Sequence, residues 1–182
     1  METAGSFFFL DGRLFVHCGV FKMLGVSLFF IGAVLIVNGI GLAGRIEPRD
    51  AAPFNLLVGG LALFVNLLGL YRADGDSGYF TAAGGLLFAF TYLYAAAVQW
   101  YGLKGVAMGW YCGFVAVSAL MFAAMETDMR MIAMWLLWSS LWLFFFIAQG
   151  LGRTLRFLPG YTVFTGIASC WIPGALMLLG RW

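Results

Sequence analysis

The chain has 182 residues, of which 63% are hydrophobic and only 10% are charged, with a formal net charge of +2. A soluble domain carries about 25% charged residues, so this composition excludes a soluble globular protein and indicates an integral membrane protein. The small net charge, and the position of the aromatic residues inside apolar segments, argue against nucleic acid as a partner.

The first 22 residues differ from the rest of the chain. The apolar run at residues 7–10 is followed by Asp11 and Arg13, which makes a poor signal-peptide core. We expect residues 1–22 to be a short interfacial tail or the product of a start site assigned too early, and residues 23–182 to be the membrane domain. His17, the only histidine, lies in this tail and is more typical of an incidental residue than of a ligand or pH sensor.

Six apolar segments are long enough to cross a bilayer as helices. A helix rises about 1.5 Å per residue, so about 20 residues cover the hydrocarbon core. The predicted fold is therefore all-α, a polytopic membrane protein with spans at 23–43, 53–71, 79–100, 105–125, 130–150 and 159–180. Short polar connections, such as 72–78 and 126–130, predict antiparallel neighbours and leave no room for a soluble domain.

Lysine and arginine are distributed unevenly between the two sets of connections. Arg72, Arg130 and Arg181 belong to one side of the predicted bundle. The connections after the first, third and fifth spans hold five basic residues, namely Arg45, Arg49, Lys104, Arg153 and Arg156. Because basic loops favour the cytoplasm, both termini are predicted to lie outside it.

No Asp, Glu, Lys, Arg or His lies well inside any predicted span. This argues against a proton- or sodium-driven pump, although backbone carbonyls alone can coordinate sodium. It also removes acid pairs, histidine triads and metal-ligand clusters, so we predict no enzyme, no metal site and no cofactor. Cys18, Cys112 and Cys170 have no metal-binding spacing and are expected to fill the interior.

Neutral polar residues share helix faces with bulky apolar residues in four spans. Each face also has a plainer explanation: leucines pack or contact lipid, tryptophans anchor at interfaces, Asn38 bonds a neighbouring helix, and Thr or Ser bonds its own backbone. The faces consist of Leu24, Leu28, Leu35 and Asn38; Thr81, Phe88, Tyr92 and Gln99; Trp135, Trp138, Trp142 and Gln149; and Thr162, Thr165 and Ser169.

Small residues predict how the spans pack. Gly25, Gly32 and Gly39 recur every seven residues on the first span, and glycine pairs lie at 59–60 and 84–85. Because glycine lowers helix propensity, its repeated use indicates close backbone approach and a tight bundle. Pro173 is expected to kink the sixth span.

Several blocks of the sequence resemble the urea/amide channel family (AmiS/UreI). The resemblance covers about residues 23–182, keeps the order and spacing of the blocks, and is most specific in GLLFAFTYLYAA at 85–96. The other blocks are Met23-Leu24-Gly25 with Gly32 and Asn38-Gly39; Asn55 with Gly59-Gly60; Trp135-Leu136 with Trp138, Leu141 and Trp142; and Trp171-Ile172-Pro173.

The resemblance implies three two-helix hairpins around a pore in each protomer, a hexameric ring in the bacterial inner membrane, and periplasmic termini. The expected substrate is a small neutral amide such as urea or acetamide, and a cytoplasmic urease or amidase is the expected functional partner. Matching positions imply that Asn38 lies near the cytoplasmic end and that the pore is lined by Leu24, Leu28, Leu35, Phe88, Tyr92, Trp135, Trp138, Leu141 and Trp142.

Two features of this sequence differ from the acid-gated members of the family that it resembles. The connections at 72–78 and 126–130 are short and lack histidine, and Thr165 stands where such channels can carry a glutamate. A passive, pH-insensitive route is therefore expected, in which Tyr92, Asn38 and Gln149 offer hydrogen bonds between aromatic walls. The alternatives are an ion-coupled transporter of short-chain amides and a membrane protein that only binds partners.

Overall fold

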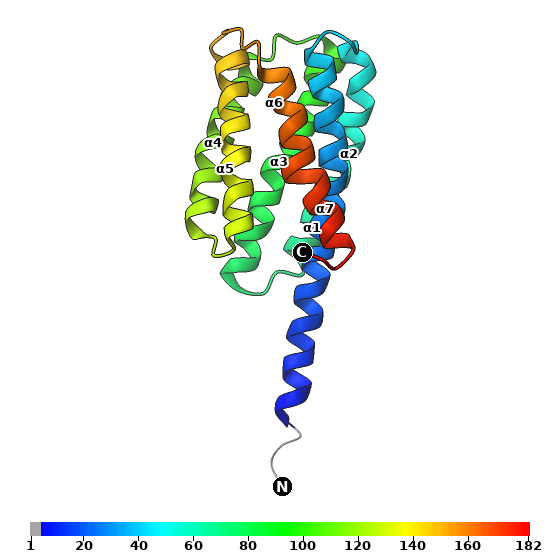
Figure 1. Cartoon of the computed structure of the whole chain (residues 1–182), viewed down its shortest axis with the longest axis vertical. Coiled ribbons are helices and arrows are strands. Elements are labelled where there is room, and N and C mark those ends of the chain that lie inside the picture. Colours follow the sequence, from blue (N-terminus) through cyan, green and yellow to red (C-terminus); the bar gives the residue numbers. More distant parts are fainter. Residues whose placement is uncertain (1–4) are drawn as a thin grey trace.

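The computed structural model describes the backbone of residues 5–182 and the side chains of residues 22–182, and in this part of the chain the regular structure is helical. The predicted all-α fold is confirmed (Figure 1). The elements are α1 (Gly5–Leu42), α2 (Pro48–Tyr71), α3 (Gly75–Tyr101), α4 (Val106–Met125), α5 (Met129–Phe145), η1 (Phe146–Gly150), α6 (Leu158–Thr165), η2 (Gly166–Trp171) and α7 (Ile172–Leu178).

Six stretches of these helices are long and apolar enough to cross a membrane, as predicted. The first span is the part of α1 from Lys22, and residues 1–21 of the expected tail lie outside the part whose side chains are described. The spans are Lys22–Leu42, Pro48–Tyr71, Gly75–Tyr101, Val106–Met125, Met129–Gly150 and Leu158–Leu178. The chain is therefore a multi-pass membrane protein.

Two helices begin earlier than the sequence predicts. α2 begins at Pro48, because a proline in the first turn gives up an N–H that has no helical partner, and it continues through Pro53 inside the helix. α3 begins at Gly75, so the connection predicted at 72–78 shortens to 72–74. Polar residues such as Asp76 were interpreted as loop, yet an acidic first turn is favourable next to the positive end of the helix dipole.

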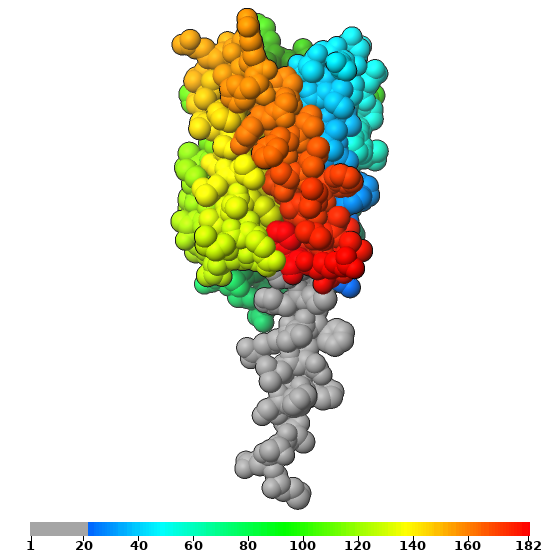
Figure 2. Space-filling model, viewed as in Figure 1, coloured from blue at the N-terminus to red at the C-terminus, as the bar shows by residue number. Residues whose placement is uncertain are grey.

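The spans form a closed ring in chain order. Within the described residues, each span packs against the one before it and the one after it, and the last span closes the ring by packing along α1. Two of the three predicted two-helix units, α2 with α3 and α4 with α5, are hairpins, whereas the third joins the first and last spans (Figure 1). α5 and the final span meet along the face seen in Figure 2. No span passes through the middle of the ring, so the ring axis is occupied by side chains and not by a helix.

The glycine stripe of α1 faces the last span, as the spacing predicts. A Cβ placed at Gly32 would lie 2.6 Å from the Cβ and the backbone nitrogen of Trp171, and one at Gly39 would lie 2.6 Å from Val163. The prediction for Gly60 is wrong: a Cβ there would meet no heavy atom within 4 Å, because this residue points away from the neighbouring helices. Gly59 alone makes the close approach from α2, toward Leu93.

Two helical segments depart from α geometry beside the axis. α5 continues into the π-helical η1, and the last span contains the π-helical η2 immediately before α7, where Pro173 occupies the first turn. A π-helical turn inserts an extra residue into a helix and is frequent at functional sites. The kink expected at Pro173 stays a prediction; what the structure shows is a π-helical segment that ends two residues before this proline.

Candidate pore and its amide cluster

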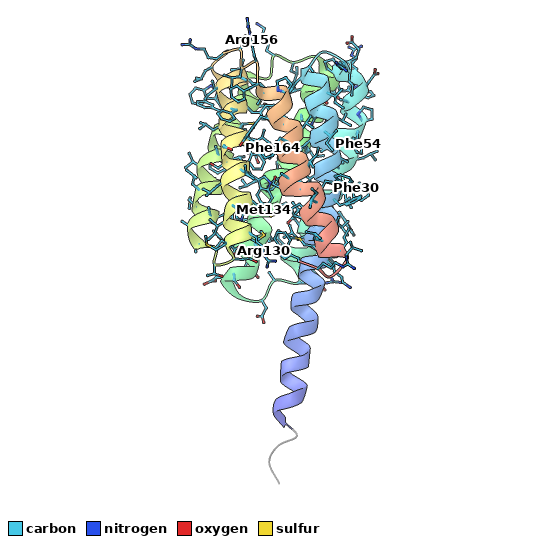
Figure 3. The ribbon with its side chains drawn as sticks, in the orientation of Figure 1. Phe30, Phe54, Arg130, Met134, Arg156 and Phe164 are labelled. Carbon is cyan, nitrogen blue, oxygen red and sulfur yellow. The ribbon has the colours of Figure 1, made fainter. Side chains whose placement is uncertain are left out.

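A cavity of about 340 Å³ enters the ring at the end where α1 meets α2 and α3 meets α4. Its lining runs from Leu103, in the turn that follows α3, to Phe88 near the middle of α3. At 1.5 Å per residue this corresponds to a depth of about 20 Å. The opening faces the same end of the molecule as Arg156, opposite the end that carries Arg130 (Figure 3).

Most of the residues that the sequence assigns to a pore line this cavity. Those that do are Leu35, Asn38, Phe88, Tyr92, Trp138, Leu141, Trp142 and Gln149. Leu24, Leu28 and Trp135 are outside its lining and lie farther along their spans, toward the opposite end of the ring. Thr165 is also outside the lining, although its neighbour Gly166 packs against the cavity-lining Leu35. Thr81, which shares a face with Phe88 on an ideal helix, is exposed and bonds the carbonyl of Ser77 in its own helix.

An aromatic cluster closes the inner end of the cavity. The Phe88 ring stands edge-on to Trp138 and Trp142, with ring centroids 4.7 and 4.6 Å away. Trp135 extends the cluster beyond the cavity: it lies 4.9 Å from Trp138 and stacks on Phe122 at 4.6 Å. Since α3 and α5 are not neighbours in the ring, the contacts of Phe88 with these indoles span the ring axis.

The Trp138 indole is held in place by the last span. Its Nε1–H donates to Ser169 Oγ at 3.0 Å, and Ser169 Oγ in turn donates to the Thr165 carbonyl at 2.6 Å. Thr162 likewise donates to a carbonyl of its own helix, that of Leu158. The plainer explanation, that Thr and Ser on this span bond their own backbone, is therefore correct for Thr162 and Ser169. The Thr165 hydroxyl, by contrast, is buried and has no partner among the described residues.

Three carboxamides meet at the side of the cavity, and the sequence identified only part of this cluster. Asn38 of α1 and Asn55 of α2 exchange two hydrogen bonds, at 2.9 and 2.7 Å. Asn55 also donates to Gln99 Oε1 of α3 at 3.0 Å. The expectation that Asn38 bonds a neighbouring helix is therefore correct, and Asn38 lines the cavity as well. Asn55 is a rare polar residue in an apolar span, which is the signal that sequence reasoning passed over.

Other polar atoms on the cavity wall are free to meet a solute. Neither the Tyr92 hydroxyl nor the Trp142 indole N–H bonds another described residue, and both side chains line the cavity. Gln149 lines the wall contributed by η1, but its Oε1 is buried beside Gly105 and has no partner in the part of the chain whose side chains are described. The wall therefore offers both donors and acceptors to a neutral polar molecule.

The lining contains no charged residue, and within residues 22–182 no cluster of His, Cys, Asp and Glu is placed to hold a metal ion. A desolvated ion in such a cavity finds no counter-charge, whereas a small dipole loses only the hydrogen bonds that the wall fails to replace. The arrangement therefore suits the binding of a small uncharged polar solute.

Comparison with known proteins identifies the family. The family model described as "AmiS/UreI family transporter" matches residues 23–181. The chain belongs to the AmiS/UreI family. An amidate-substrates transporter protein of Mycolicibacterium smegmatis is 39% identical over 167 residues, which cover 88% of this chain and 78% of that protein. The acid-activated urea channel of Helicobacter pylori is 32% identical over 194 aligned positions, which cover 88% of this chain and 100% of the channel.

Solved structures of the AmiS/UreI family share the ring. The Helicobacter pylori urea channel, determined by cryo-electron microscopy in a closed state, aligns with a TM-score of 0.79 and 34% sequence identity. The alignment covers 87% of this chain and 99% of that structure. A crystal structure of the urea channel from the same organism gives a TM-score of 0.78 at 32% identity. The six-helix fold is thus the fold of a known channel of this family.

Proposed function

We propose that the ring is a passive route for small neutral amides such as urea and acetamide across the bacterial inner membrane. The observation that carries the proposal is the uncharged cavity, about 20 Å deep at 1.5 Å per residue, which is walled by Phe88, Tyr92, Trp138 and Trp142. Indole and phenol rings accept weak N–H···π contacts from an amide, while their polar ends bond it at intervals. Hydrated ions and protons find no such replacement for water, so the ion gradient is preserved.

The names of the relatives support amides as the solute. The Mycolicibacterium smegmatis relative is an amidate-substrates transporter, and the Helicobacter pylori relative is a urea channel. Both solutes are planar and uncharged, which suits a slot between flat rings. We further propose that the route has no acid gate, because the connections opposite the cavity mouth are confined to residues 72–74 and 126–128 and contain no histidine. In this proposal the protein acts as a channel, with no catalytic role and no cofactor.

The orientation proposed here places the cavity mouth in the cytoplasm and both termini in the periplasm. The support is the distribution of basic residues, because the connections beside the mouth carry Arg45, Lys104 and Arg153. We further propose that several protomers assemble into a larger ring, a homo-oligomer that is hexameric by family resemblance. The apolar outer surface of each protomer then contacts lipid and the neighbouring protomers. A cytoplasmic urease or amidase that consumes the solute keeps its flow inward.

The proposal is tested by stopped-flow light scattering on proteoliposomes. Wild-type protein is expected to speed urea and acetamide entry over empty liposomes. Trp138→Ala and Trp142→Ala are expected to alter both the flux and the urea-to-acetamide ratio. The matched control is Trp110→Ala, because Trp110 is 60% exposed on the outer face of α4. Absence of wild-type flux contradicts the channel and favours a partner-binding protein; accumulation that collapses with an uncoupler favours a coupled transporter.

A further inference from the structure

The orientation of the Asn55 carboxamide is fixed by the backbone of its own helix. Its Nδ2 donates to the Ala51 carbonyl at 3.1 Å. A carbonyl oxygen only accepts hydrogen bonds, so the amino group of Asn55 must occupy this position. The side chain is 0% exposed, and no water is needed to satisfy it, because its amino group and its oxygen both have partners within the protein.

This anchored amino group determines the orientation of the two amides that line the cavity. The two hydrogens of Asn55 Nδ2 are shared among three acceptors, because Asn38 Oδ1 at 2.7 Å and Gln99 Oε1 at 3.0 Å lie within bonding distance as well as the Ala51 carbonyl. The oxygens of Asn38 and Gln99 therefore point toward Asn55. Asn38 uses one N–H on Asn55 Oδ1, and Gln99 reaches Asn38 Oδ1 only at 3.4 Å, which leaves N–H groups to face the cavity.

We propose that Asn55 is a positioning residue that turns this side of the cavity into a hydrogen-bond donor site for the carbonyl oxygen of the solute. Asn38 and Gln99 supply the donors, and Asn55 prevents either amide from rotating to offer its oxygen instead. This inference rests on the proposed function and adds which atom of the amide is recognised.

A second asparagine on the same helix shows that the arrangement is specific to this position. Asn66 likewise bonds a carbonyl one turn back, that of Ala62 at 2.7 Å, yet it does not line the cavity and bonds no other side chain among the described residues. An asparagine that only satisfies its own helix would look like Asn66. Asn55 instead connects three spans of the ring, each at the level of the cavity.

The test compares urea with thiourea in proteoliposomes. Thiourea keeps both amino groups but replaces the carbonyl oxygen with sulfur, which is a weaker acceptor. Asn55→Leu removes the anchor while leaving both lining amides in place, so they become free to present either end. The urea-to-thiourea flux ratio is expected to exceed one in the wild type and to fall about three- to tenfold in Asn55→Leu, the equivalent of one hydrogen bond. Asn66→Leu is the matched control and keeps the wild-type ratio.

Gln99→Leu provides an independent arm, because it deletes one donor from the half-buried wall without emptying the buried site of Asn55. It is expected to lower the same ratio. The inference is overturned by a wild-type ratio at or below one, or by a ratio that stays unchanged in whichever of the two variants folds. The latter result leaves amide flux intact and so leaves the proposed function standing. Loss of all wild-type urea flux contradicts the proposed function instead.

Discussion

The ring of Phe88 on α3 meets the ring of Trp142 on α5 edge-on, with centroids 4.6 Å apart and planes at 70°. The two helices do not pack against each other, so this contact joins opposite walls of the ring across its axis. Trp138, one turn away from Trp142 on α5, also meets the Phe88 ring edge-on, at 4.7 Å. Phe88 therefore packs against two indoles at the inner end of the cavity.

Removal of the Phe88 ring is expected to widen the route and to reduce its selectivity. In Phe88→Ala, the cavity is expected to extend toward Trp135, because the Phe88 ring also lies between the cavity and Trp135, 6.0 Å from the Trp135 ring centroid. Water and glycerol flux should rise relative to urea flux in stopped-flow assays. Phe90→Ala serves as control, since Phe90 lies on the same helix and is 47% exposed toward the outside. Equal selectivity in the two variants would contradict a constriction at Phe88.

The hydrogen bond between Trp138 and Ser169 is expected to stabilise the fold. Ser169→Ala leaves the buried indole N–H without a partner, which costs about 1–3 kcal/mol in the free energy of unfolding. In the Ser169→Ala protein, Trp138→Phe also removes the unpaired donor. Trp138→Phe should therefore lower the free energy of unfolding by less in Ser169→Ala than in the wild type. Thermal unfolding in detergent measures both. Ser118→Ala is the control, because Ser118 is exposed and bonds only its own helix; additive losses would show that the pair does not interact.

The glycine stripe of α1 predicts a contrast between two glycines. Gly32→Val places a side chain against the Trp171 backbone at 2.6 Å, which cannot move aside, so α1 separates from the last span and stability falls by about 1–3 kcal/mol or more. Gly60→Ala enters open space and should stabilise α2 by about 0.5–1 kcal/mol through its higher helix propensity. Melting temperatures and the retention of a monodisperse peak in gel filtration provide the comparison. A stable, monodisperse Gly32→Val protein is the outcome at odds with this packing.

Asp128 predicts how stability responds to acid. The guanidinium of Arg130, bonded at 2.7 Å, holds the pKa of the Asp128 carboxyl below its usual value. A carboxyl with a lower pKa in the folded state stabilises the fold at pH above its unfolded value of about 3.9 and loses this contribution as pH falls through its folded value. The difference in melting temperature between wild type and Asp128→Asn should be constant from about pH 5 to 8 and narrow below about pH 4. A difference that already changes near neutral pH would point to another titrating group.

Flux is expected to be independent of pH over the range in which acid-activated channels respond. Histidine is the side chain that changes charge between about pH 5 and 8, and the single histidine of this sequence, His17, precedes the membrane domain. Urea entry into proteoliposomes should therefore be the same at pH 5.5 and pH 7.5. If entry rises at the lower pH, His17→Ala identifies whether that histidine is responsible, and the absence of an acid gate is then disproved.

The sequence alone determined the fold class, because the length and apolar content of six segments leave few other ways to satisfy the backbone in a bilayer. Helical periodicity also grouped Phe88 with Tyr92 and Trp138 with Trp142 on shared helix faces, since a face is a local property of one helix. That these faces line a pore was implied by the family resemblance. The closure of the ring by α1 and the last span was not predictable in this way. It depends on the fit of Gly32 and Gly39 against Trp171 and Val163, which lie far away in the chain.

The polar chemistry of the cavity was decided by tertiary structure. The direction of a carboxamide depends on the atoms that surround it, and Asn38, Asn55 and Gln99 come from three different spans. Periodicity could place Asn38 and Gln99 on their faces, but it could not show that the amino group of one buried asparagine bonds both of their oxygens. For the same reason it could not separate Thr165, whose hydroxyl is left without a described partner, from Ser169, which holds Trp138. A hydrogen bond between distant residues exists only once the chain has folded.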